Sequence, residues 1–324
     1  MTFLSQDRIV RATSDSAKFR LVLVDATRAA NSIAAMHEAR GYASQLLGES
    51  IASALLIASG LKGPGTVQLR FSLSGDISRV NADATPFGLV RAMIPREEIL
   101  RTGSFEPMVL PQTLRVVKLD KDGSRLSEGV VEMVAADISA SVTHYLKQSE
   151  QGTYFLRVTA RYDEAESRLR FAGGLLLETF PGFIPAEWDK VKELAAGVDF
   201  ENHVRPDGQG LRLGAVQELF GAAFPIQVHK EFEIEPFCPC SEESVLRALS
   251  SLGREGLESL FLENREAEMF CEFCRKRYAV SVPQILGLLN EAEEAEKEAE
   301  ILGDDAELPG EPETPEDPET PEDK

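Results

Sequence analysis

The four cysteines of this 324-residue chain form two close pairs, Cys238-Pro-Cys240 and Cys271-Glu-Phe-Cys274, separated by 30 residues. Two close pairs on a module-sized spacer are typical of a tetrahedral zinc site in which each pair supplies two thiolates. Four thiolates fill the coordination shell and leave no position for a reactive water molecule. The spacing therefore predicts one zinc ion bound by Cys238, Cys240, Cys271 and Cys274, without hydrolytic chemistry.

These cysteines suit either a permanent structural zinc knuckle or a redox switch, and their spacing alone leaves both open. A disulfide across Cys238-Pro-Cys240 closes a tight ring, and strained disulfides are the readily reduced ones. The basic residues 275–277 follow Cys274 and favour its reactive thiolate form, although Glu272 partly opposes them. If zinc folds this module, oxidation of its ligands converts a chemical signal into local unfolding. These features favour a switch.

Other reactive sites are not evident in the sequence. The histidines are scattered, and we expect each to be a surface or core residue rather than a metal ligand: His37, His144, His203 and His229. There is no G-x-x-x-x-G-K-S/T run for ATP and no recognisable Ser-His-Asp signature. The sequence predicts a binding protein rather than an enzyme.

Charge is distributed unevenly along the chain. The net charge is −20, and residues 291–324 contribute −14 of it through 16 acidic and 2 basic side chains. The rest of the chain has a net charge of −6 and offers no broad basic surface, so we expect no nucleic-acid partner. No apolar run reaches the ~20 residues of a membrane span, and residues 1–10 lack the apolar core of a signal peptide. We therefore expect a cytoplasmic protein, in which thiols stay reduced.

Residues 1–182 carry both helical and strand periodicities, and 43% of the chain is hydrophobic, enough for a sizeable core. Apolar spacing predicts helices at 29–39 and 42–59, and Asp137 is the expected cap of a helix that runs to Lys147. Short turns join neighbouring strands, so we predict an α+β core domain with a mostly antiparallel sheet. The expected strands are 19–24, 67–73, 77–84, 88–94, 114–119, 129–135, 154–160 and 169–177.

Three smaller segments follow this core. Residues 183–237 contain short helical patterns and few apolar residues, which predicts a helical linker of marginal stability. Residues 238–289 are expected to form the zinc module, with two short helices broken at Gly253. In residues 290–324, a solvated helix extension is followed by proline at every third position, so we expect a disordered, acidic tail. The linker helices are predicted at 187–196 and 215–220.

With these features the chain resembles the 33 kDa heat-shock chaperonin family, the bacterial redox-regulated holdases. The resemblance spans residues 5–285 and is most specific at the two cysteine pairs. Further similar stretches are GYASQLL at 41–47, NADATPFGLV at 81–90, YLKQSEQ at 145–151, AGGLLLETFPG at 172–182 and EMFCEFC at 268–274.

The resemblance implies a specific switch. The reduced protein would bind one zinc ion through all four thiolates and be inactive. Oxidants would form the disulfides Cys238–Cys240 and Cys271–Cys274, release zinc and unfold the linker at 183–237. The active form, a homodimer, would hold unfolded client proteins without ATP. Pro239 stiffens the first pair, so we expect Cys271–Cys274 to oxidise first.

Two alternatives stay open at this point. The Cys271–Cys274 pair could serve a thiol-disulfide oxidoreductase, although such motifs usually open a helix after a strand. The zinc module could instead be a constitutive zinc ribbon that binds a partner. Residues 237–285 hold 8 acidic and 6 basic side chains, which argues against nucleic acid as that partner.

Overall fold

The computed structural model of the protein describes residues 7–101, 112–134, 137–150, 152–200, 220–221, 223–262 and 267–304. The chain forms two compact units. The first comprises Met1–Pro239 with Cys271–Lys276, and the second comprises Cys240–Phe270 with Arg277–Lys324. The expected linker helix at 215–220, apart from its last residue, and the proline-rich segment from Pro309 onward lie outside the described residues.

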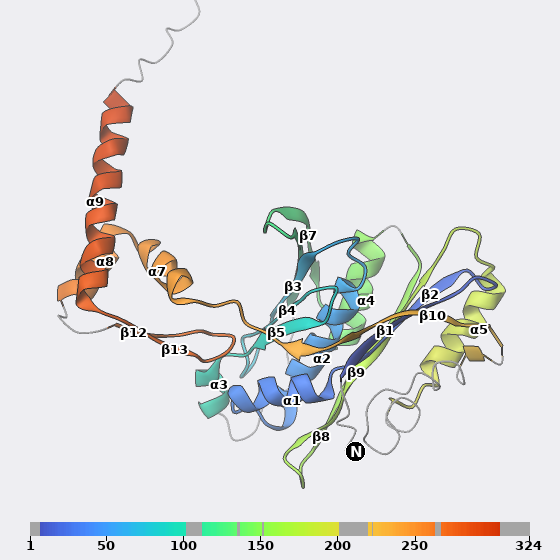
Figure 1. Ribbon diagram of the computed structural model, residues 1–324. Coiled ribbons are helices and arrows are strands. Elements are labelled where there is room, and N and C mark those ends of the chain that lie inside the picture. Colours follow the sequence, from blue (N-terminus) through green and yellow to red (C-terminus); the bar gives the residue numbers. More distant parts are fainter. Residues whose placement is uncertain are drawn as a thin grey trace, which may run out of the picture. The chain divides into compact units, whose positions relative to one another are not determined.

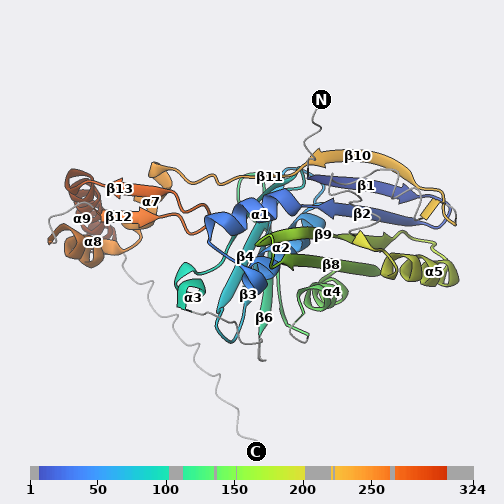
Figure 2. The same ribbon diagram turned by 90° about the horizontal axis from the view of Figure 1, so that it is seen from below.

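The first unit contains a five-stranded antiparallel sheet in the order β10-β1-β2-β9-β8, and Figure 2 shows these strands side by side. Both faces of this sheet are covered, which explains the unbroken apolar run of β2. Val22 and Val24 belong to the larger core cluster, whereas Leu21 and Leu23 belong to a second cluster beneath helix α5 (Pro185–Ala196). The strands are β1 (Arg8–Ser14), β2 (Phe19–Asp25), β8 (Tyr154–Asp163), β9 (Arg168–Thr179) and β10 (Gln227–Glu233).

A second sheet of six strands has the order β11-β5-β4-β3-β6-β7. All of its pairs are antiparallel except β11 on β5. Strand β3 shows the predicted period of two, because Val67, Leu69 and Phe71 are buried on one face. The strands are β3 (Gly65–Ser72), β4 (Arg79–Ala84), β5 (Leu89–Met93), β6 (Thr113–Asp120), β7 (Arg125–Glu132) and β11 (Glu235–Pro236).

Helix α2 (Gly41–Ala58) is the centre of the larger core and is apolar nearly all round. It packs on β8 and β9 of the first sheet and on β4 of the second (Figure 1). Small residues allow this close approach: a Cβ added at Gly48 would lie 2.8 Å from the Cβ of Ala160. Because α2 contacts both sheets, a helix predicted from its alanine and leucine content joins them into one core.

Carboxylates bind the first backbone N–H groups of two further helices of the first unit. Asp137 caps α4 (Ile138–Ser149), as predicted, by accepting a hydrogen bond of 2.8 Å from the backbone of Ala140. The buried carboxylate of Asp7 accepts bonds of 3.0 and 2.7 Å from the backbone N–H groups of Arg28 and Ala29 at the start of α1 (Thr27–Met36). These bonds satisfy amides that have no partner within a helix.

The α+β architecture with antiparallel sheets is confirmed, and a helix or strand occupies each predicted position between residues 19 and 177. Four elements are not predicted from the sequence: β1, the short helix α3 (Arg96–Arg101), and the strands β10 and β11 near the end of the linker. In the linker, α5 matches the predicted helix at 187–196. The linker is therefore not only helical, because its last residues pair with both sheets.

The second unit is small and has its own apolar core. The predicted break at Gly253 is confirmed, since α7 ends at Ser250 and α8 begins at Gly253, whose φ is +68°. No helix in the described part of the chain is both long and apolar enough to cross a membrane. The elements are α7 (Glu242–Ser250), α8 (Gly253–Leu262), β12 (Ala267–Phe270), β13 (Arg277–Val280) and α9 (Val282–Asp304), and the core includes Val245, Leu249, Leu257, Val280 and Ile285.

Candidate metal centre

The four predicted cysteines meet at one point. Their sulfur atoms all lie within 4.8 Å of one another, and those of Cys238 and Cys271 are 3.6 Å apart. Each cysteine is partly buried, and none of the four forms a disulfide. A tetrahedral ion with metal–sulfur distances of about 2.3 Å separates its ligands by ~3.8 Å, so this cluster has the size and donor set of a four-thiolate metal site.

The first pair is anchored on both sides. Before it, the backbone N–H of Phe237 donates a hydrogen bond of 2.9 Å to the carbonyl of Val90 in β5. After it, Ser241 caps α7 through a reciprocal capping box with Ser244. Cys238 therefore follows directly on a strand of the core sheet, and Cys240 directly precedes a helix.

The second pair lies in the turn that follows β12 in the chain. The backbone N–H of Arg275 donates to the carbonyl of Cys271 at 2.9 Å, and the N–H of Cys271 donates to the carbonyl of Lys276 at 3.0 Å. Arg275 has a φ of +60°, a left-handed conformation that closes the turn. This backbone brings the sulfurs of Cys271 and Cys274 to the same side, as shared ligation requires.

Phe273, between these two cysteines, packs against a charged cluster of the first unit. The Arg91 guanidinium lies 4.1 Å from the centre of its ring, and that of Arg70 lies 6.0 Å away. Asp83, only 3% exposed, binds both arginines at 2.5 and 2.7 Å. The buried carboxylate thus fixes two cations against one aromatic face.

His37 makes a second contact with the same turn. This residue is fully buried, and its Nε2 lies 3.0 Å from the carbonyl oxygen of Phe273 and 3.2 Å from that of Ala92. Burial lowers the pKa of His37, and the hydrogen bond to the carbonyl of Phe273 partly offsets this by raising the pKa. A neutral imidazole with Nε2 protonated therefore donates to the two carbonyls. As predicted, His37 is a core residue outside the cysteine cluster.

Two donors approach the sulfur atoms themselves. A guanidinium nitrogen of Arg91 lies 3.9 Å from the sulfur of Cys238, and the hydroxyl of Tyr278 donates to the sulfur of Cys240 at 3.1 Å. Donors beside a sulfur stabilise the negative thiolate that binds metal. Neither residue is predicted from the sequence, in which only the basic residues 275–277 stand next to a cysteine.

The basic residues 275–277 also contact groups other than the cysteines. Arg275 donates to the carbonyl of Ile94 at 3.2 Å, and Arg277 pairs with Glu268. The other histidines lie outside the cluster where they are described: His144 pairs with Gln148, and His229 with Thr13. His203 lies outside the described residues.

Comparisons with known proteins agree over most of the chain. A family model described as Hsp33 protein matches residues 7–281. A 33 kDa chaperonin of Microcystis aeruginosa is 31% identical over 87% of this chain and 97% of its own length. A 33 kDa chaperonin of Pelobacter propionicus is 28% identical over 88% and 95%. The crystal structure of a Thermotoga maritima 33 kDa chaperonin superposes with a TM-score of 0.73 over 89% of this chain and 99% of that one at 20% identity, which shows the shared fold.

Proposed function

Because this chain belongs to the Hsp33 protein family, we propose that it is a redox-regulated chaperone that binds unfolding proteins without ATP. It is a holdase rather than an enzyme, acts in the cytoplasm and forms a homodimer when active. The observation that carries the proposal is the position of the four-thiol cluster. Cys238 lies two residues after β11, so the site is joined by one short connection to a strand of the core sheet.

In the reduced protein, Cys238, Cys240, Cys271 and Cys274 would hold one zinc ion. Four thiolates fill the coordination shell of zinc, so the bound ion would supply a structural cross-link between the two pairs and no catalysis. Arg91 and Tyr278 support the thiolate form of two ligands through the contacts described above. Binding free energy at such a site is also folding free energy for the residues around it.

Oxidation removes the ligands. With hydrogen peroxide as the oxidant, two cysteine thiols and one peroxide molecule give one disulfide and two molecules of water, so two electrons pass from sulfur to oxygen. The pairs Cys271–Cys274 and Cys238–Cys240 are the disulfides that result. A sulfur in a disulfide is a poor metal ligand, so the oxidised pairs would no longer hold the ion. The cysteine cluster then no longer holds the residues before Cys238 in place.

The linker covers apolar surface that its release exposes. Trp188 and Val191 of α5 and the aromatic ring of Phe220 are buried in the second core cluster with Phe19 and Phe171 of the first sheet. The Phe19 and Phe220 ring centres are 6.2 Å apart. Each aromatic residue of such a cluster buries roughly 150–250 Å². An exposed sheet face of this kind suits apolar segments of unfolded client proteins.

The position of the second pair argues against a thiol-disulfide oxidoreductase. A catalytic Cys-x-x-Cys usually opens a helix after a strand. Here Cys271 and Cys274 lie between β12 and β13, which pair antiparallel, and no helix begins at this pair. The arrangement favours a metal-binding turn.

The test is aggregation of a heat-denatured client without ATP, measured by light scattering. We expect the oxidised, zinc-free protein to suppress aggregation and the reduced, zinc-bound protein to do so far less. Equal suppression by both forms would refute the switch and support a constitutive chaperone or zinc-ribbon protein. Turnover of insulin disulfides with a reductase would support the oxidoreductase.

A further inference from the structure

The last residues of the linker form the outer strand of both core sheets. β10 pairs antiparallel with β1 from Arg8 to Thr13, and β11 pairs parallel with β5 at Leu89 and Val90. β10 and β11 are each the edge strand of their sheet, and Figure 2 shows them along β1 and beside α1. One continuous segment, residues 227–237, therefore covers two sheet edges and ends directly before Cys238.

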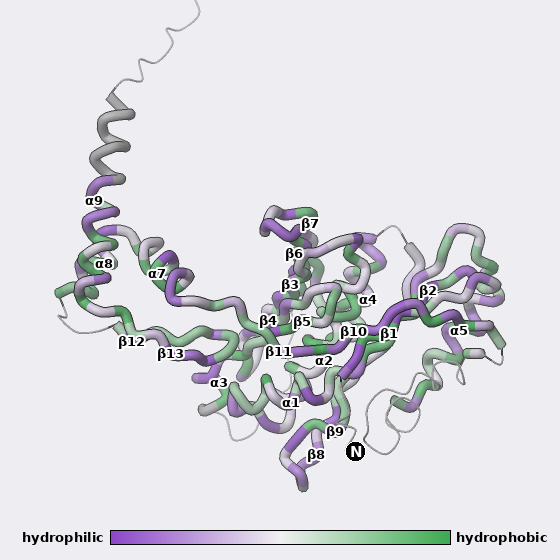
Figure 3. Tube along the Cα trace, in the orientation of Figure 1, coloured by the Kyte–Doolittle hydropathy of each residue, from purple (hydrophilic) through white to green (hydrophobic). Residues whose placement is uncertain are grey.

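The side chains of β10 are largely exposed, so most of them contribute little to its pairing with β1. Its sequence, QVHKEFE, is mostly hydrophilic (Figure 3), and none of its residues is fully buried. Arg8 and Glu231 form an ion pair of 2.7 Å, but both are partly exposed, and such pairs stabilise little. The register of the pairing also shifts between Arg11 and Ala12. Phe232 adds ring contacts with Phe87 and Arg11. The backbone ladder extends along the whole strand, and any extended chain can supply it.

Backbone hydrogen bonds also hold the segment against β5. Backbone N–H groups of Glu235 and Phe237 donate to the carbonyls of Gly88 and Val90 at 3.0 and 2.9 Å. Gly88 has a φ of +97°, and a Cβ there would lie 2.0 Å from the carbonyl oxygen of Glu233. The edge is therefore shaped for close approach by another backbone.

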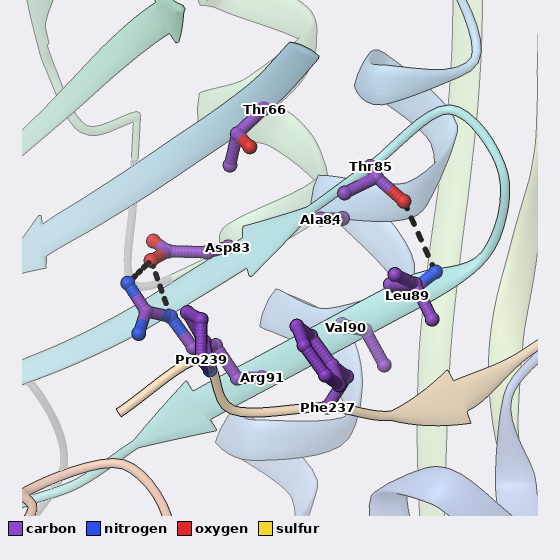
Figure 4. Close-up of a pocket in the computed structure, with 9 residues that line it drawn as sticks. All are labelled: Thr66, Asp83, Ala84, Thr85, Leu89, Val90, Arg91, Phe237 and Pro239. Atoms are coloured by element: carbon purple, nitrogen blue, oxygen red, sulfur yellow. Dashed lines mark hydrogen bonds and ion pairs between the residues drawn. The ribbon is translucent and has the colours of Figure 1, made fainter. Parts of the chain in front are cut away.

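Two apolar side chains anchor this segment: Ile234 is buried in the larger core cluster, and Phe237 lies at the edge of β5. The ring of Phe237, 51% exposed, lies against a pocket of about 120 Å³ (Figure 4). Leu89 and Val90 supply its apolar wall, and Asp83 with Arg91 its polar end. The pocket has the character of a site for one aromatic or large apolar side chain of an extended segment.

We propose that the edges of β1 and β5 bind extended segments of unfolded client chains, which add as strands in place of residues 227–237. The inference rests on the proposed function, because the linker must be released first. Strand addition relies on main-chain hydrogen bonds and a few apolar anchors, so it tolerates many sequences. Residues 227–237 occupy this site in the folded linker and so act as its internal competitor.

A peptide with the sequence of residues 227–237, QVHKEFEIEPF, tests this on the full chain. One analogue carries N-methyl groups on Glu235 and Phe237, whose N–H groups bond to β5. An isomeric control carries them on Glu231 and Glu233. The N–H of Ile234 bonds to Asp7, and successive amides of a strand point in opposite directions, so the control positions face away from β1.

We expect the fluorescently labelled parent and control peptides to bind the oxidised protein, and the edge-methylated peptide to bind about tenfold or more weakly. The reduced protein should bind none of them, and an unfolded client should displace the parent peptide. In hydrogen exchange of the oxidised protein, client should restore protection to the backbone amides of β1 and β5.

The outcomes separate the two proposals. If the oxidised protein does not suppress client aggregation, the proposed function and this inference both fail. If it suppresses aggregation but all peptides bind alike, or client neither displaces the peptide nor protects β1 and β5, only strand addition fails. If sedimentation shows a dimer that excludes the peptide, the edges of β1 and β5 bind a second copy of the chain. That result also overturns the inference.

Discussion

Replacement of Val191 by alanine should release the linker without altering the cysteines. Val191 is fully buried in the second core cluster, where α5 covers the first sheet. The substitution removes two methyl groups, and at about 0.8 kcal/mol for each, with a cavity left behind, it costs about 2 kcal/mol. Because 1.4 kcal/mol is tenfold, the equilibrium between docked and released linker shifts about 30-fold toward release.

The assay uses the reduced, zinc-bound variant and a heat-denatured client without ATP. We expect Val191→Ala to suppress aggregation under conditions in which the parent does not, while it keeps its zinc and all four cysteines stay reduced. Trp188 is the single tryptophan of the chain and is buried in the same helix. Its emission should shift to longer wavelength in the variant as α5 leaves the sheet.

Val142→Ala is the matched control. Val142 is also fully buried, but in α4 and in the larger core cluster, so the side chain lost is the same and the linker is untouched. This control should lose comparable stability and stay inactive when reduced. If the two variants behave alike in the reduced state, docking of the linker is not what restrains the chaperone, and the reasoning is refuted.

Three further predictions concern the metal centre and the core. Cys240→Ser should weaken zinc binding by more than about tenfold in a chelator competition, because a ligand is lost; parent-like affinity would show that Cys240 is not a ligand. Asp83→Asn leaves two arginines without their buried counter-charge, and we expect about 3 kcal/mol less stability in urea unfolding; a change below about 0.5 kcal/mol would contradict the described cluster. Burial raises the pKa of Glu49 from 4.5 to about 7. The folded protein therefore binds more protons than the unfolded chain between these values, so this carboxyl makes stability fall as pH rises through them. Glu49→Gln should remove this fall of stability with rising pH. A variant whose stability between pH 5 and 8 changes as in the parent would contradict the prediction.

The sequence was sufficient for features carried by local patterns. The apolar spacing of α2, the alternation in β3 and the cap at Asp137 each depend on residues near one another in the chain. The cysteine cluster was also predictable, because four thiols in two pairs have few other uses.

Residues that act across long separations could not be found this way. His37 contacts Phe273, and Arg91 contacts Phe273 and Cys238, through folds of the chain that no local pattern encodes. β10 was missed for a different reason. Its side chains are polar and largely exposed, and its partner strand supplies the hydrogen bonds, so its sequence has little of the hydrophobic alternation that marks a half-buried strand.

The central claim is that thiol oxidation, zinc release and client binding are one event. The most direct test measures all three on a single sample during titration with peroxide: free thiols by a colorimetric reagent, released zinc by a chromogenic chelator, and suppression of client aggregation. The account predicts that the four thiols of each chain are lost as one zinc ion is released, and that activity appears with it. Activity that reaches its maximum while zinc and all four thiols remain in place would contradict the account.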